Sequence, residues 1–120
     1  MKTVLIVDSD LGFVAFLSKS LSQAGYEVLP ATTSQTAISL LKELKNPKVD
    51  LLVVNLGLLN TANLATALKT KHKSLRIIAI QDFSPNAVIN IPVDARLRKP
   101  APDELEADWY TTARRVLDDK

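Results

Sequence analysis

The segment that most constrains the fold is residues 49–63, which read VDLLVVNLGLLNTAN. Leu51 to Val54 form a short, wholly apolar run, and turn-forming residues follow it. A run of this kind is typical of a strand that is buried on both faces of a parallel sheet. Ligands bind such sheets in the crevice at the carboxyl ends of the strands. Asn55 takes that place, and Gly57 lets the backbone turn tightly after it.

Strand-like and helix-like patterns alternate along the whole chain. Short apolar runs predict strands at residues 4–7, 26–29, 51–54 and 76–80. Residues 95–98 alternate arginine with apolar side chains, which predicts a weaker fifth strand at a sheet edge with one wet face. The alternation predicts an α/β protein, folded as a three-layer sandwich around a five-stranded parallel sheet.

The first two helices have start signals at their amino ends. Asp10 is placed to cap a helix that runs from Leu11 to about Ala24. After a loop at residues 30–33, Ser34 is placed to cap the second helix.

The later helices are less evenly defined. Asn60 or Thr61 opens a third helix, and Pro102 starts the last one, with Trp109 on its apolar face. Residues 81–94 are irregular, because their prolines limit any helix there to about two turns. We therefore expect a shortened or distorted fourth helix between the last two strands.

Length and composition exclude several classes of protein. A chain of 120 residues fits one domain, and the absence of cysteine excludes disulfides and thiolate metal sites. No apolar run approaches membrane-spanning length, and the amino-terminal run turns acidic at Asp8, too early for a signal peptide. We expect a soluble cytoplasmic protein with no membrane partner. A net charge of +2 is weak evidence for a polyanionic partner.

Polar residues follow the predicted strands at the edge where parallel strands end together. They are Asp8-Ser9-Asp10, Asn55, Gln81-Asp82 and Lys99-Pro100. With these residues the sequence resembles the receiver domain of two-component response regulators along its full length. The matching segments are VLIVDSD, AGYEV, VDLLVVNLGL, LRIIAI and RLRKP. The resemblance implies a single receiver-like domain over residues 1–120 with flavodoxin-like topology.

In that family, two adjacent acids after the first strand and an aspartate after the third hold magnesium, and that aspartate is phosphorylated. A threonine or serine after the fourth strand and a lysine after the fifth contact the phosphoryl group. By this resemblance, Asp8 and Lys99 match the family pattern, whereas Asn55 replaces the phosphorylated aspartate.

Other positions also depart from the family pattern. Ser9 replaces the second acid, unless Asp10 substitutes for it, and Gln81 replaces the threonine or serine. Arg96 stands where an aromatic switch residue is usual. Asn63 replaces a common glycine, and asparagine tolerates the left-handed conformation better than most residues.

These departures change the chemistry of the expected pocket. The amide of Asn55 is neither an anion nor a nucleophile, so it cannot attack a phosphoryl donor. One carboxylate with neutral neighbours is a poor magnesium site, so we expect weak or absent magnesium binding and no other cofactor. We therefore expect a degenerate receiver (pseudo-receiver), a non-enzymatic module that binds protein partners independently of phosphorylation.

The resemblance also implies a partner surface. The family uses the fourth strand-helix unit, the fifth strand and the last helix for output and dimerisation. The candidate contact residues there are Arg96, Arg98, Tyr110 and Arg114. The expected partners are proteins of a signalling pathway, with a homodimer through this face as one candidate.

The densest basic cluster lies between the third helix and the fourth strand. It comprises Lys69, Lys71, His72, Lys73 and Arg76. The favoured interpretation is a solvated helix end, where the helix dipole stabilises cations. A nucleic-acid partner is therefore not expected for this domain alone.

Two alternative functions remain open from the sequence. Asp8 and Asp10 resemble the Asp-x-Asp pair of haloacid-dehalogenase-type phosphatases, in which the first aspartate is a nucleophile and the second a general acid. A small magnesium-dependent phosphatase is thus one alternative, although the usual Gly-Thr after the pair is absent. The other is a receiver that is phosphorylated on Asp8 or Asp10 as a surrogate carboxylate.

Overall fold

The computed structural model describes residues 2–45, 47–81, 91–98 and 107–118. Within these ranges the chain forms five strands and four helices. The strands are β1 (Thr3–Val7), β2 (Glu27–Ala31), β3 (Leu51–Val54), β4 (Arg76–Gln81) and β5 (Ala95–Arg98). The helices are α1 (Leu11–Gln23), α2 (Ser34–Glu43), α3 (Thr61–Lys71) and α4 (Ala107–Asp118).

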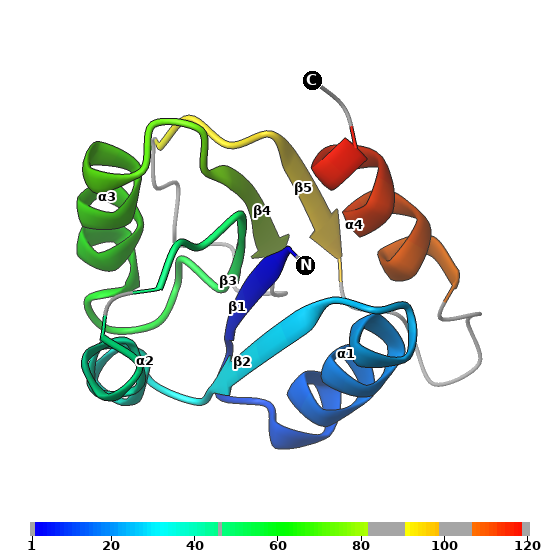
Figure 1. Cartoon of the computed structure of the whole chain (residues 1–120), viewed down its shortest axis with the longest axis horizontal. Helices are drawn as coiled ribbons and strands as arrows, with labels where there is room; N and C mark the ends of the chain where they lie inside the picture. The colour runs from blue at the N-terminus through cyan, green and yellow to red at the C-terminus, as the bar shows by residue number, and fades with distance from the viewer. Residues whose placement is uncertain (1, 46, 82–90, 99–106, 119–120) are drawn as a thin grey trace.

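All strand pairs are parallel, and the strand order is β2-β1-β3-β4-β5. This is the flavodoxin-like order, in which the chain reverses direction across the sheet between β1 and β3. Helices α2 and α3 cover one face of the sheet and α1 and α4 the other (Figure 1). The predicted three-layer α/β sandwich is therefore confirmed.

The core has two halves, one on each face of the sheet. Leu5 and Val7 of β1 pack with α2 and α3, whereas Val4 and Ile6 pack with α1 and α4. Successive strand residues point to opposite faces, so a wholly apolar run is needed where both faces are covered. Trp109 is 2% exposed, which confirms its expected place in the core.

The strand predictions hold except at one point. The strand at 95–98 has the predicted bounds, lies at the edge of the sheet and exposes its two arginines. The loop predicted at residues 30–33 was wrong at its start, because Pro30 and Ala31 continue β2 and pair with Ile6 and Val7. Edge strands tolerate proline, since its missing N–H leaves no ladder bond unmade on the solvent side.

One detail of the helix starts also differs from prediction. Thr33, not Ser34, caps α2, and its hydroxyl oxygen accepts a hydrogen bond from the Thr36 N–H at 3.0 Å. Asn63 lies inside α3 and does not use the left-handed conformation that asparagine tolerates. Asn60, at the start of α3, has that conformation instead, with φ 64°.

Two regions of interest lie outside the described residues. They are the shortened helix predicted between β4 and β5 and the predicted start of the last helix at Pro102. Among the helices that the structure describes, none has the length and apolar character needed to cross a membrane.

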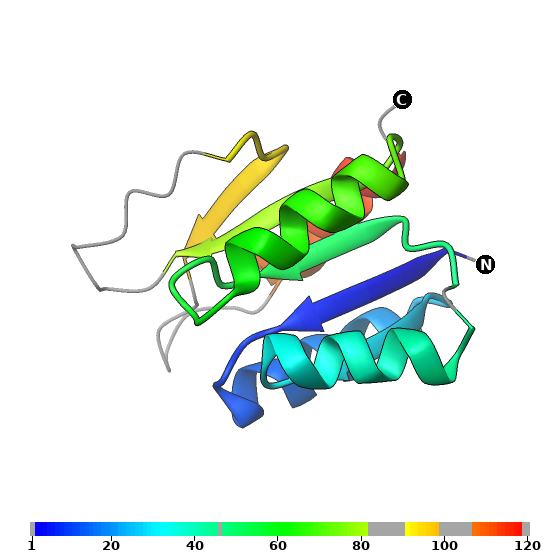
Figure 2. The same cartoon turned by 90° about the vertical axis from the view of Figure 1, so that its left-hand side faces the viewer.

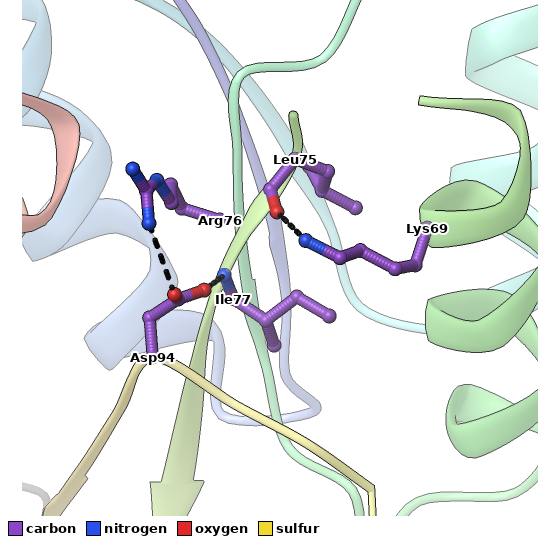
Figure 3. Close-up of polar contacts among 5 residues, drawn as sticks. All are labelled: Lys69, Leu75, Arg76, Ile77 and Asp94. Atoms are coloured by element: carbon purple, nitrogen blue, oxygen red, sulfur yellow. Dashed lines mark hydrogen bonds and ion pairs between the residues drawn. The ribbon is translucent and has the colours of Figure 1, made fainter. Parts of the chain in front are cut away.

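Two aspartates fasten neighbouring strands at the edge where the strands begin, which we call the amino edge. Asp50 precedes β3, and its carboxylate accepts the Thr3 N–H of β1 at 2.9 Å. Asp94 precedes β5, and its carboxylate accepts the Ile77 N–H of β4 at 2.7 Å (Figure 3). The Asp50 N–H also donates to the Thr3 carbonyl, and the Asp94 N–H donates to the Ile77 carbonyl. The same reciprocal clasp therefore joins β3 to β1 and β5 to β4.

Candidate functional site

The candidate site lies at the opposite edge, the carboxyl edge, where the strands end. Val7 pairs with Val54, so Asp8 and Asn55 follow two neighbouring strands at the same level. The Asn55 N–H donates to the Val7 carbonyl at 3.0 Å, which holds the two strand ends together. The chain reverses across the sheet between these strands, and open α/β sheets bind their ligands there. The expected meeting of Asp8 and Asn55 is thus observed.

Both residues are buried despite their polar side chains. Asp8 is 0% exposed and Asn55 is 2% exposed. The Asp8 N–H donates to the Ala31 carbonyl at 3.2 Å, and one carboxylate oxygen accepts the Asp10 N–H at 3.0 Å. This bond shapes the turn after β1 and leaves Ser9 exposed between the two aspartates.

Asp10 has a structural role in this turn. It is exposed, and its carboxylate accepts the Phe13 N–H at 3.1 Å, as the cap of α1. A carboxylate near a helix amino end is stabilised by that bond and by the helix dipole. The predicted capping role of Asp10 is therefore confirmed.

The described residues of the turn after β1 do not fit a magnesium ion. Among the described residues, no three His, Cys, Asp or Glu side chains are grouped closely enough to hold a metal. The two carboxylates of this turn are separated by Ser9, and Asp10 already uses an oxygen on α1. Magnesium needs near-octahedral oxygen ligands at short range, and this donor set supplies too few.

The loop after Asn55 is held by its own side chains. The Asn55 side-chain oxygen accepts the Gly57 N–H at 2.9 Å. Thr61 is completely buried, and its hydroxyl lies 2.8 Å from both the Asn55 and the Leu58 carbonyl oxygens. A hydroxyl has one hydrogen, so these two carbonyls share it. The backbone of residues 55–61 is thus fixed from inside.

A further tie comes from α2. Ser34 is buried, and its hydroxyl donates to the Leu59 carbonyl at 3.0 Å, across 25 residues of sequence. The Leu59 side chain points outward and is 84% exposed. An open surface hollow lies along the same loop, lined by residues 56–60, 62 and 63. The sequence did not predict that Ser34 and Thr61 hold this loop. The one signal for Ser34 was that Thr33 alone is sufficient to cap α2.

The remaining predicted residues that the structure describes lie on β4, β5 and α4. Gln81 ends β4 at the carboxyl edge and is in register with Arg98. Arg96 and Arg98 are exposed, and they alternate with residues that pack on the α1–α4 face, so they point to the α2–α3 side. Arg114 is exposed on α4, which covers the other face. The predicted contact residues therefore lie on two sides of β5, with Arg96 and Arg98 on one side and Arg114 on the other.

Lys99 and the side chain of Tyr110 lie outside what the structure describes. Arg98 and Trp109 connect the two sides of β5, because the Trp109 indole N–H donates to the Arg98 carbonyl at 3.0 Å. The helix that carries Tyr110 and Arg114 is thus fixed to the end of β5.

Comparisons with known proteins find the fold but no close relative. No protein-family model and no curated protein match the chain. A CheY-like response regulator receiver domain protein from Methanospirillum hungatei JF-1 superposes with a TM-score of 0.77 at 22% identity, covering 98% of this chain and 94% of that one. The chain has the receiver fold. At this level of identity the likeness establishes the fold alone.

Two further solved structures share this fold. A response regulator from Burkholderia pseudomallei with a phosphorylated aspartic acid gives a TM-score of 0.70 at 22% identity, covering 99% of this chain and 68% of that one. A chain from the complex of the histidine kinase ThkA with the response regulator protein TrrA gives 0.72 at 20% identity, covering 98% and 100%.

Proposed function

We propose that this chain is a receiver-type module of two-component signalling that binds protein partners without being phosphorylated at position 55. The observation that carries the proposal is Asn55, buried beside Asp8 at the carboxyl ends of β3 and β1 in a receiver fold. Phosphorylation of a receiver requires a carboxylate oxygen to attack phosphorus and displace the donor's leaving group. An amide offers no such oxygen.

The contacts of the loop support a module with one fixed state. Three side-chain groups hold residues 55–61, from Asn55, Thr61 and Ser34. None of these bonds requires a phosphoryl group or a metal ion. A loop that is already ordered needs no phosphoryl group to order it, which supports partner binding that is independent of phosphorylation.

The partner is proposed to be a protein of the same signalling class. One structural neighbour comes from a complex of a histidine kinase with a response regulator, which supports a protein partner. The proposed contact residues are Arg96 and Arg98 on β5 and Tyr110 and Arg114 on α4. A homodimer through the same elements is the alternative occupant of this surface.

The test is partner capture with and without acetyl phosphate and magnesium, combined with intact mass measurement of the chain. We expect an unchanged mass and a partner yield that does not depend on the phospho-donor. Partner binding that requires the donor contradicts the proposal. A phosphate adduct that maps to Asp8 or Asp10 would instead establish the surrogate-carboxylate alternative.

A restored-site variant provides the matched positive control. Asn55→Asp with Ser9→Asp returns the missing acids, and we expect it to show magnesium-dependent NMR shifts with beryllofluoride, which mimics an aspartyl phosphate. The native chain is expected to show none around Asp8 and Asn55. Equal shifts in the native chain would mean that a metal-dependent site survives without these acids.

The phosphatase alternative receives no support from the geometry. A nucleophile must reach its substrate, yet Asp8 is 0% exposed, and the proposed acid Asp10 is bonded to the start of α1. We expect no magnesium-dependent hydrolysis of a generic phosphomonoester. Hydrolysis that is lost in Asp8→Asn would reverse this conclusion.

A further inference from the structure

The amino edge carries much of the chain's positive charge. Residues 42–50 and 69–76 contain seven of the 15 basic residues and two of the 13 acidic residues. The basic residues are Lys42, Lys45, Lys48, Lys69, Lys71, Lys73 and Arg76, and the acidic residues are Glu43 and Asp50. The rest of the chain is therefore net acidic, although the whole chain is net basic.

Three of these cations have partners within the fold. Lys69 donates to the Leu75 carbonyl at 2.5 Å, and Arg76 lies 3.4 Å from the Asp94 carboxylate (Figure 3). Lys48 lies 3.8 Å from the Asp50 carboxylate. These three cations are therefore already hydrogen-bonded or ion-paired within the fold.

Four lysines remain without a hydrogen bond or ion pair among the described residues: Lys42, Lys45, Lys71 and Lys73. All four are exposed. The helix dipole accounts for cations in the last turns of α2 and α3. It does not account for Lys73, which lies beyond α3, or for Lys45, which has φ 60° where glycine or asparagine is usual.

The two lysine pairs lie on one side of the molecule. Helices α2 and α3 pack on the same face of the sheet through one shared core cluster. Figure 2 shows them running in the same direction, with their carboxyl ends at the amino edge. Glu43 is the only acidic residue in 42–45 and 69–73. Of the nearby acids, Asp50 accepts the Thr3 N–H of β1 and Asp94 accepts the Ile77 N–H of β4. An extended anion thus meets four exposed cations along this edge.

The composition of the edge selects the class of anion. Six of its seven cations are lysine, and residues 42–50 and 69–76 contain no phenylalanine, tryptophan or tyrosine. Protein interfaces rely on tryptophan, tyrosine and arginine, and single-stranded nucleic acid requires aromatic platforms. Lysines without aromatics suit a phosphodiester backbone that is contacted as a line of charge. We propose that this edge binds the phosphate backbone of double-stranded nucleic acid without reading its sequence.

This inference does not depend on the function proposed for the carboxyl edge. Asn55 and the lysines lie at opposite ends of the strands, so either site can fail its test without affecting the other.

The test is the salt dependence of binding to a short labelled DNA duplex, measured by fluorescence anisotropy. Four phosphate contacts predict a slope of about −3.6 in log K against log salt. Lys71→Ala with Lys73→Ala is expected to reduce the slope to about −1.8. Lys19→Ala with Arg115→Ala removes the same charge from exposed positions on α1 and α4 and should leave the slope unchanged.

Several results would overturn the proposal. They are no binding at low salt, equal slopes for the two double variants, tighter binding of single-stranded DNA, or binding only to phosphatidylserine vesicles. The last result would assign the lysines to a lipid surface. Circular dichroism of both double variants checks that a reduced salt-dependence slope does not result from unfolding.

Discussion

At the two edges of the sheet, polar side chains accept hydrogen bonds from donors at very different distances along the chain. At the carboxyl edge, Asp8, Asp10 and Asn55 each accept an N–H only two or three residues farther along the chain. At the amino edge, Asp50 and Asp94 accept N–H groups 47 and 17 residues away. The first set shapes turns, whereas the second set joins strands.

This difference bears on how much each edge contributes to the stability of the fold. A turn-shaping side chain can change identity with a local cost, so the carboxyl edge accommodates an amide at position 55. A strand-joining side chain cannot be replaced at only a local cost, because its loss leaves a buried N–H without an acceptor and weakens the contact between two strands. We accordingly expect the polar bonds of the amino edge to contribute more to the stability of the fold than those of the carboxyl edge.

The largest effect is expected at the strand clasps. Asp50→Ala and Asp94→Ala should each lower the free energy of unfolding by about 2 kcal/mol, because each variant leaves a buried backbone N–H without an acceptor. Urea denaturation measures this loss. Asp50→Asn keeps an oxygen acceptor and should recover more than half of it. A loss below that of Asp10→Ala would remove the distinction between the edges.

A smaller effect is expected for the cap of α1. Asp10→Ala should cost about 1 kcal/mol, because the Phe13 N–H loses its acceptor at the start of the helix. Thermal denaturation measures it, with Ser9→Ala as a control at the neighbouring exposed position. Equal losses for the two variants would show that the capping bond contributes nothing.

The tie between α2 and the Asn55 loop should have a modest effect. Ser34→Ala removes the hydrogen bond to the Leu59 carbonyl and should cost about 0.5 kcal/mol, because water can replace it at this surface loop. Amide exchange of residues 57–61 should accelerate in this variant and not in Ser39→Ala. Unchanged exchange would mean that Thr61 and Asn55 suffice to fix the loop.

The smallest effect concerns backbone strain at the two edges. Lys45 at the amino edge and Asn60 at the carboxyl edge both have positive φ, at 60° and 64°. Lys45→Gly should stabilise the fold by about 0.5 kcal/mol, as the relief of strain exceeds the added unfolded-state entropy. Asn60→Gly should gain less, because asparagine tolerates this conformation. Chemical denaturation of both variants gives the comparison.

Local patterns predicted most of the elements because their causes are local. Strands β1, β3, β4 and β5 and the cap of α1 follow from residues within a few positions of each other. The errors fell where a distant group decided the outcome. Pro30 remains in β2 because that strand lies at an edge, and Ser34 leaves the capping role to Thr33 because it bonds to Leu59.

The candidate site was predictable only in part. Parallel strands end together, so Asp8 and Asn55 were expected to meet, and the register of β1 and β3 places them side by side. The roles of Ser34 and Thr61 in holding the loop were not predicted. Their partners are backbone carbonyls, which every residue carries, so no residue type in the sequence marks them.

The sequence by itself determined the α/β alternation, the two-sided burial of the central strands and the chemistry that an amide at position 55 cannot perform. These follow from side-chain identity and short periodicity. The tertiary structure alone decided which aspartates join strands, which lysines remain exposed without partners and which hydroxyls fix the Asn55 loop. Those properties depend on neighbours brought together from distant positions, and spacing along the chain does not record them.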